Sequence, residues 1–512
     1  MITKKKPSRP IKIRMIFLGN LLILATYAFK CHGFHMNSLE SGSRIKRKIQ
    51  TRPIIFSLHQ SVVKSNEKAP KKTIKVCIVG AGPSGLLAAH CLLKSGKQVS
   101  VYESRPDPRL LDKEDRAYAL GIGIRGRTAI RSVDESLWNA VRARGYESER
   151  FDLYLTPKIK LRLRNGSKNK DVEPSLLLSQ SDLCAALLDG LEKRYPNFKV
   201  HFKQQISMVC SNKNCVSLES SDGENIVAGP FDVIVGCDGV NSVVRKSIEH
   251  KSFTQKVQVL PGEFKVCQSS SLPSNIDSTA VSLILPKAGS TTAFFEPTSK
   301  RGGCILFSTG RGVQDKIMSG NLTGDDILER FPLLDGVDLE ELTRQLKKQA
   351  PSRASSVQCN IYHCGSTVLC GDAAHATGGV SGQGVNSGLV DATVLAECLQ
   401  DTEAANIQDA LLKYSKRQVP EGKALYDLSF GPEGNVSFTK QLLMILTTAV
   451  DFFFQGRFGI GRPPLQTLLG QTLISFSDIR RKRNSLFIDK FPDVEVTNKS
   501  LEKLHNQMKT CI

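Results

Sequence analysis

The chain has 512 residues, of which 40% are hydrophobic and 23% charged, which is the composition of a globular enzyme and excludes a wholly disordered or fibrous protein. The formal net charge is +21, but residues 1–72 hold 16 Lys and Arg against two acidic residues, a net of +14 that leaves +7 for the rest. Because the body has no basic stripe interleaved with aromatic residues, we expect no nucleic-acid binding.

The first 72 residues are predicted to form a targeting leader. Six basic residues precede an apolar run at 15–29, which is short for a membrane-spanning helix and suits a signal peptide, so residues 1–31 are assigned to a signal. Residues 32–72 are basic, contain serine and nearly lack acidic residues, as transit peptides do. We expect delivery through the ER to the plastid of a complex-plastid alga. The alternative is a signal anchor that holds the protein at the ER or another membrane.

A short apolar strand at 76–79 runs into a glycine-rich turn and an apolar helix at 86–93, and a second strand at 99–102 ends in an acidic residue. In this G-x-G-x-x-G arrangement the first glycine permits a tight turn, the second lets a pyrophosphate approach, and the third lets the helix pack on the strand. The acidic residue can accept hydrogen bonds from a ribose. The predicted cofactor-binding residues are Gly80, Ala81, Gly82, Pro83, Ser84, Gly85 and Glu103.

Two later strands also lead to glycine and aspartate. The strand at 231–236 precedes the pattern D-G-x-x-S-x-x-R, and the strand at 366–370 precedes a Gly-Asp pair and a helical pattern that starts near 385. A helix N-terminus has unsatisfied N–H groups and partial positive charge, which suits a pyrophosphate or the electron-rich edge of an isoalloxazine. The predicted residues are Asp238, Gly239, Gly371, Asp372, Gln383, Gly384, Val385 and Asn386.

The three motifs, in this order, resemble those of the single-component flavoprotein aromatic hydroxylases. The segments RAYALGIGIRGR at 116–127 and VPEGKALYDLS at 419–429 are similar to kynurenine 3-monooxygenase-like proteins, and the similarity covers roughly residues 73–485. This resemblance implies an α/β fold with a Rossmann-like FAD-binding domain, an antiparallel-sheet substrate domain and C-terminal helices that associate with a membrane surface. The implied domains are 73–250 plus 355–430 for FAD, 251–354 for the substrate sheet and 431–512 for the helices.

Short alternating runs at 280–285, 291–295 and 303–307 independently predict antiparallel strands in the substrate domain. The resemblance places Arg125 and Gln180 along the flavin and the adenosine. It implies FAD as the cofactor, NAD(P)H as a transient co-substrate, and O2, with a C4a-hydroperoxyflavin that hydroxylates an aromatic or similarly flat molecule. We therefore expect neither a catalytic side chain nor a metal, and we expect His375 to orient backbone rather than to transfer protons.

The chain departs from the kynurenine 3-monooxygenase pattern where the substrate binds. That enzyme holds the amino-acid head group with Arg, Tyr and Asn side chains, and the matching positions here lack most of them, while Gly379 replaces a proline beside the flavin. We expect a substrate other than kynurenine. Two alternatives stay open: a flavin-dependent reductase or dehydrogenase on the same scaffold, and a non-catalytic flavin-binding protein associated with a membrane.

Overall fold

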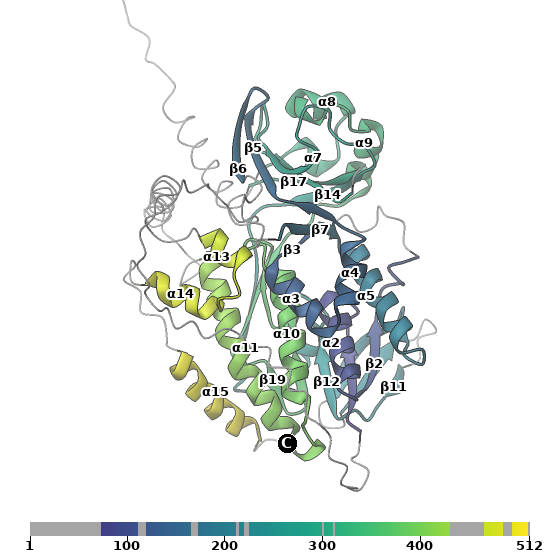
Figure 1. The fold of residues 1–512 in the computed structure, drawn as a ribbon, viewed down its shortest axis with the longest axis vertical. Helices are drawn as coiled ribbons and strands as arrows, with labels where there is room; N and C mark the ends of the chain where they lie inside the picture. Colours follow the sequence, from purple (N-terminus) through teal and green to yellow (C-terminus); the bar gives the residue numbers. More distant parts are fainter. Residues whose placement is uncertain are drawn as a thin grey trace, which may run out of the picture.

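The computed structural model describes residues 73–110, 119–164, 173–210, 214–219, 225–299, 302–310, 313–430, 465–484 and 494–509. The predicted leader, 1–72, and the apolar stretch at 438–454 lie outside these residues, so the expectations for them stay predictions. The described chain forms a larger lobe around a parallel sheet and a smaller lobe around an antiparallel sheet (Figure 1). Within the described residues, no helix combines the length and apolarity needed to cross a bilayer.

The larger lobe contains a six-stranded sheet in the order β19-β20-β12-β1-β2-β8. Its central strand β1 pairs in parallel with β12 and β2, and β12 pairs in parallel with β20. The carboxyl ends of β1, β12 and β20 therefore meet at one edge, which is where the three predicted motifs begin. The strands are β1 Lys75–Val79, β2 Gln98–Glu103, β8 Val200–Phe202, β12 Val233–Gly236, β19 His363–Cys364 and β20 Thr367–Leu369.

Helices pack against this sheet and carry the apolar stripes that the sequence pattern predicts. The helices α2 and α10 lie side by side (Figure 1), because Gly371 and Gly388 leave room for the side chain of Ser84. The helices of this lobe are α2 Pro83–Lys94, α3 Ile124–Val133, α4 Glu135–Arg142, α5 Gln180–Arg194, α6 Val243–Lys246, α10 Gly384–Leu399, α11 Ile407–Phe430, α13 Leu465–Gln471, α14 Phe476–Asn484 and α15 Val494–Lys509.

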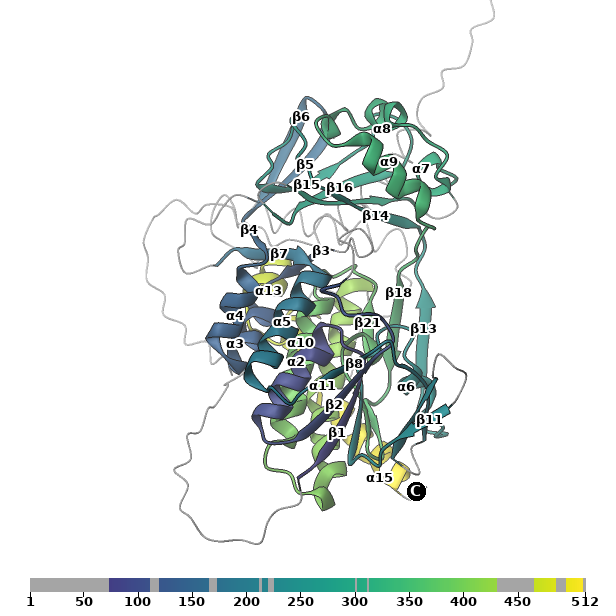
Figure 2. The same ribbon diagram turned by 90° about the vertical axis from the view of Figure 1, so that its right-hand side faces the viewer.

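The smaller lobe contains a six-stranded sheet in the order β14-β17-β16-β15-β5-β6. Its strands are β5 Arg150–Thr156, β6 Ile159–Arg164, β14 Phe264–Ser269, β15 Ala280–Ile284, β16 Thr292–Pro297 and β17 Gly303–Ser308. Three helices cover its upper face: α7 Lys316–Ser319, α8 Gly324–Arg330 and α9 Leu339–Lys348 (Figure 2). The predicted segment 251–354 supplies four of the six strands, and β5 and β6 join from earlier in the chain because β5 pairs in parallel with β15.

Two small sheets connect the lobes. The strands β13 Gln255–Val259, β18 Ser355–Cys359 and β21 His375–Thr377 form one of them, and β13 and β18 run from the smaller lobe down to the larger one (Figure 2). The other contains β3 Ala119–Ile122, β7 Ser175–Ser179 and β4 Tyr146–Ser148, and it lies directly beneath the antiparallel sheet. A third small sheet, β9 Gln205–Cys210, β10 Cys215–Glu219 and β11 Asn225–Ala228, belongs to the larger lobe.

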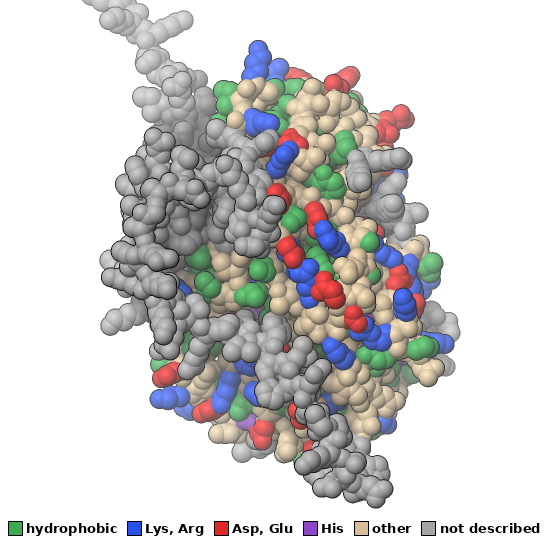
Figure 3. Space-filling model, in the orientation of Figure 1, with side chains coloured by type: hydrophobic (Ala, Val, Ile, Leu, Met, Phe, Trp, Pro, Cys, Tyr) green, Lys and Arg blue, Asp and Glu red, His purple; other side chains and the backbone are tan. Residues whose placement is uncertain are grey.

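The surface over α4 and α5 carries acidic and basic side chains in alternation (Figure 3). Arg109 pairs with Glu192 at 2.6 Å, and Arg142 pairs with Glu147 at 2.7 Å. Exposed pairs of this kind contribute little to stability, about 0 to 1 kcal/mol each. Their effect is to balance the charge of this face locally.

Candidate cofactor site

Glycines bring the end of β1 next to the end of β12. Gly80 follows β1 with a φ of +103°, and a Cβ there would lie 2.5 Å from the carbonyl oxygen of Cys237. A Cβ on Gly85 would lie 2.0 Å from the carbonyl oxygen of Gly80. Both glycines are therefore required by the protein's own packing, as the fingerprint predicts.

Gly82 differs from these two glycines, because a Cβ at this position would meet nothing within 4 Å. Its backbone is in an ordinary extended conformation, with a φ of -72°, and it forms the N-cap of α2. The protein thus leaves open space at the N-terminus of a 12-residue helix, where free N–H groups and the helix dipole favour an anion. Gly82 therefore leaves the room that a pyrophosphate needs to approach the backbone, and binding there stays a prediction.

Glu103, at the end of β2, is buried and holds the glycine turn. Its Oε2 accepts a hydrogen bond from the N–H of Ala81 at 2.8 Å, and its Oε1 accepts one from Nε of Arg105 at 2.8 Å. Burial alone would raise the pKa of Glu103, but the contacts with Arg105 and the Ala81 N–H lower it below the usual value. The carboxylate is therefore charged and fixed, and its contact with a ribose stays a prediction.

Asp238 binds the first N–H groups of the short helix α6 after β12, whose N-cap is Ser242. Its Oδ2 accepts hydrogen bonds from the N–H groups of Val243 at 2.6 Å and Val244 at 3.2 Å. Its Oδ1 is buried and has no hydrogen-bond partner among the described residues, and burial raises the pKa of the side chain. Gly239 follows with a φ of +75° and open space where a Cβ would stand. This loop therefore offers both an unused acceptor and room for a ligand.

Arg245 ties the Asp238 loop to the third motif. The buried guanidinium donates from Nε to Oε1 of Gln255 at 2.7 Å, from Nη1 to the carbonyl of Ala373 at 2.9 Å and from Nη2 to the carbonyl of Val240 at 2.6 Å. The motif included this arginine, but no sequence pattern predicts its partner 128 positions away. Its role is to fix two loops of the site relative to each other.

The third motif is held by Asp391, a residue that the sequence analysis did not select. Its buried Oδ2 accepts hydrogen bonds from the N–H of Gly371 at 3.0 Å and pairs with Nε2 of His375 at 2.6 Å. The ring of Tyr362 stacks on His375 with centroids 5.5 Å apart. The sequence does contain a signal for this residue, because Asp391 is an acidic residue within the apolar pattern of α10. Asp391 therefore holds the backbone directly, and the expectation that His375 orients the backbone stays a prediction.

Asp372 lies between Gly371 and His375, the two residues that Asp391 contacts, and is itself exposed. The residue is solvent-accessible, yet desolvation by the surrounding protein raises its pKa, with a smaller opposing effect of His375. A Cβ on Gly384 would lie 3.8 Å from its Oδ1, so the carboxylate is next to the start of α10. Gln383, the N-cap of α10, is buried, and Val385 follows it in the first turn.

Asn386 links α10 to β3 and α3. Its Oδ1 accepts from the N–H of Gly123 at 2.8 Å, and its Nδ2 donates to the carbonyl of Gly121 at 2.9 Å. The amide thus positions the start of α3 at the site. Whether it also contacts a cofactor stays a prediction.

Arg125 is buried against the C-terminal segment. Its guanidinium donates to the carbonyls of Leu469 and Ile474 and lies 4.4 Å from the ring centroid of Phe476. Burial lowers the pKa of Arg125 to about 10. The side chain therefore fixes α13 and α14 to α3, and its predicted flavin contact stays a prediction. Gln180 is the half-buried first residue of α5.

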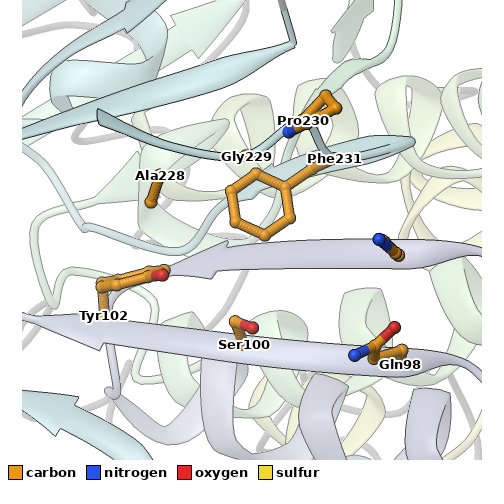
Figure 4. Close-up of a pocket in the computed structure, with 8 residues that line it drawn as sticks. Gln98, Ser100, Tyr102, Ala228, Gly229, Pro230 and Phe231 are labelled. Carbon is orange, nitrogen blue, oxygen red and sulfur yellow. The ribbon is translucent and has the colours of Figure 1, made fainter.

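A separate cavity of about 190 Å³ lies between β1, β2 and the segment that leads into β12 (Figure 4). None of the predicted cofactor residues lines it. Its walls are Lys75, Gln98, Ser100, Tyr102, Ala228, Gly229, Pro230 and Phe231.

Among the described residues, no group of three His, Cys, Asp or Glu side chains gathers as metal ligands would. The predicted cofactor site comprises the open turn at Gly82, the Oδ1 of Asp238 that has no partner among the described residues, and the accessible Asp372.

The pair of His375 and Asp391 predicts a pH-dependent stability. Burial alone would lower the pKa of His375, but Asp391 raises it above the usual 6.5. A raised pKa in the folded state contributes stability that is complete below pH 6.5 and is lost as the pH rises through the folded pKa. We expect the melting temperature to decline above that pH in the wild type. Asp391→Asn should flatten this decline, and below pH 6.5 it should lower the free energy of unfolding by about 3 kcal/mol. An equal decline in both proteins, followed by calorimetry, would contradict this.

Comparison with known proteins identifies the family. Residues 73–429, more than half of the chain, match the family model described as FAD binding domain, and the protein belongs to this family. Kynurenine 3-monooxygenase of Sus scrofa is 29% identical over 363 residues, which are 69% of this chain and 74% of that protein. Kynurenine 3-monooxygenase of Anopheles gambiae is 27% identical over 367 residues, 70% of this chain and 73% of that protein.

Solved structures share the fold. The tetrameric form of 2-methyl-3-hydroxypyridine-5-carboxylic acid oxygenase has a TM-score of 0.58 at 18% identity and covers 72% of this chain and 95% of its own. P. aeruginosa PqsL in complex with 2-aminobenzoylacetate has a TM-score of 0.54 at 20% identity. The match covers 70% of this chain and 95% of the PqsL chain. The predicted α/β fold and the FAD cofactor are confirmed, and the protein is an FAD-dependent monooxygenase.

Proposed function

We propose that the protein hydroxylates an aromatic or similarly flat small molecule with NAD(P)H and O2. The observation that carries this proposal is the convergence of Gly82, Asp238 and Asp372 at one edge of the parallel sheet, below the antiparallel sheet. When bound there, FAD supplies the redox and oxygen chemistry. The chain's own contribution is to bind the pyrophosphate at the start of α2, to fix the surrounding loops and to exclude water.

The lower face of the antiparallel sheet supports a flat, apolar substrate. Its aromatic and aliphatic side chains face β3 and β7 rather than α7 to α9. Phe151, Leu153, Val281 and Leu283 are buried there with Leu177 of β7, and Phe294, which packs against this cluster, is only partly buried. An apolar wall opposite a cofactor favours a planar ring and keeps water from the reacting atoms. A polar wall would instead favour a hydrated substrate.

The test is NADPH and NADH oxidation by the FAD-loaded protein, with and without a panel of aromatic compounds, together with mass detection of the products. Incorporation of one oxygen atom from labelled O2 in step with NAD(P)H oxidation supports hydroxylation. Substrate-dependent oxidation without oxygen transfer favours the reductase or dehydrogenase alternative. An FAD-loaded protein that oxidises neither nucleotide favours the non-catalytic alternative.

We predict that kynurenine is not the preferred substrate. Its head group needs a cation for the carboxylate, yet Arg150 pairs with Asp277 at 3.2 Å, Arg144 pairs with Asp189, and Arg125 is occupied by backbone carbonyls. On the lower faces of β5 and β14 to β17, no described residue is Lys or Arg. A buried head group without partners would cost several kcal/mol, which is about a thousandfold in affinity.

Micromolar kynurenine should therefore not accelerate NADPH oxidation, whereas the Sus scrofa relative, assayed in parallel, serves as the positive control. Stoichiometric 3-hydroxykynurenine from micromolar kynurenine would show that the prediction is wrong.

A further inference from the structure

Glu296 lies on the lower face of the antiparallel sheet. Its neighbour Phe295 is fully buried with Ile305 and Phe307 in the core beneath α7 to α9. Because side chains alternate along a strand, Glu296 and Phe294 point to the opposite face, toward β3 and β7. Register across the ladder places Glu296 opposite Cys304 of β17.

The surroundings of Glu296 carry no other charge. On the described lower faces of β5 and β14 to β17, Glu296 is the one acidic or basic side chain. The register places Cys304 and then Gln268 in its row, and Phe294, Leu306 and Val266 in the next row. The residue is half-buried, and desolvation raises the pKa of its carboxyl group to about 7. A carboxylate in such surroundings is costly without a cationic or hydrogen-bonding partner.

Other carboxylates of the smaller lobe have such partners within the described chain. Glu263 pairs with Arg353 at 2.7 Å, and Asp315 pairs with Arg330 at 2.8 Å. Among the described residues, none forms an ion pair of this kind with Glu296. The partner we infer for it is therefore a bound molecule.

Glu296 also lies on the cofactor side of the lobe interface. Cys304, its cross-strand neighbour, packs with Val266 and with Ala119 of β3. The strand β3 leads to Gly123, whose N–H is held by Asn386 in the first turn of α10. A short run of contacts thus connects Glu296 to the helix that starts beside Asp372.

We propose that Glu296 binds a basic nitrogen of the substrate, so that the substrate is an aromatic amine carrying a positive charge and no carboxylate. This inference rests on the proposed function, because it assumes that the substrate occupies the space below the sheet. The ammonium group would donate a charge-assisted hydrogen bond to the Glu296 carboxylate while the ring packs on the apolar face. Glu296 would then determine specificity without taking part in the oxygen transfer.

The test is equilibrium binding to the FAD-loaded protein, followed by the perturbation of the flavin absorbance, at about pH 8, above the pKa of about 7. Three probes share one phenol ring and differ in charge: tyramine is a cation, 4-ethylphenol is neutral and 3-(4-hydroxyphenyl)propanoate is an anion. We expect the wild type to bind tyramine about tenfold more tightly than 4-ethylphenol and the anion most weakly. Glu296→Gln should lose the preference for the cation and keep its affinity for the neutral probe.

Glu263→Gln is the matched control, because Glu263 is an ion-paired carboxylate of the same lobe, and it should keep the preference. Glu296→Asp retains the charge and should keep a preference for the cation even if the glutamine variant fails to fold. Any of three results would overturn the inference. The preference for the cation could survive in Glu296→Gln, the wild type could fail to favour the cation, or no probe could bind. Because binding is measured without turnover, failure to detect hydroxylation would count against the proposed function and leave this result standing.

Discussion

Gly82→Val is expected to give a folded protein that purifies without FAD. The protein itself tolerates the new side chain, since the φ of -72° suits any residue and nothing lies within 4 Å of the added Cβ. The space that valine fills is the one in which the pyrophosphate must approach the backbone. Loss of two charge-assisted hydrogen bonds there would cost about 4 kcal/mol, roughly a thousandfold in affinity.

The measurement is the flavin absorbance of the purified protein, followed by titration of the colourless protein with FAD. Gly85→Ala is the contrasting variant, because its Cβ would lie 2.0 Å from the carbonyl oxygen of Gly80 and should destabilise the fold itself. Stability is compared between cofactor-free proteins, since bound FAD stabilises the native state by mass action. A yellow Gly82→Val protein with one FAD per chain would contradict the assignment of the turn.

Arg245→Met is expected to destabilise the native state by about 3 to 6 kcal/mol. Methionine replaces the aliphatic part of the arginine side chain but leaves three acceptors without their donor: Oε1 of Gln255 and the carbonyls of Ala373 and Val240. Each unsatisfied acceptor costs about 1 to 3 kcal/mol, and two of the three, Oε1 of Gln255 and the carbonyl of Val240, are only partly buried and lie toward the lower end of that range. Because the same contacts fix the Asp238 loop to the Gly371 turn, FAD should also dissociate more readily.

Urea denaturation of the cofactor-free protein and the rate of FAD release measure the two effects separately. Arg353→Met is the control, because that arginine is 62% exposed and makes an ion pair with Glu263, and its loss should change stability by about 0.5 kcal/mol or less. If Arg245→Met unfolds at the same urea concentration as the wild type and retains FAD, the two loops are held by other contacts.

Local sequence patterns determined the existence and order of the cofactor motifs. Short apolar strands, glycines at their ends and a helical period immediately afterwards are all specified within about ten residues, so the βα units could be predicted. Parallel pairing then requires the strand ends to lie at one edge, and Gly80, Asp238 and Gly371 do lie there. The alternating runs of β15, β16 and β17 were predictable for the same local reason.

The tertiary structure alone decided which partner each buried polar group finds. Hydrophobic periodicity shows which face of an element is buried, but not the element that covers it. Contacts such as that of Arg245 with Ala373, or of Arg125 with Leu469, join residues 128 and 344 positions apart. The pairing of β5 with β15 and the exposure of Glu296 to the space below the sheet arise in the same way. They depend on how separate segments pack, and that packing is a property of the whole chain.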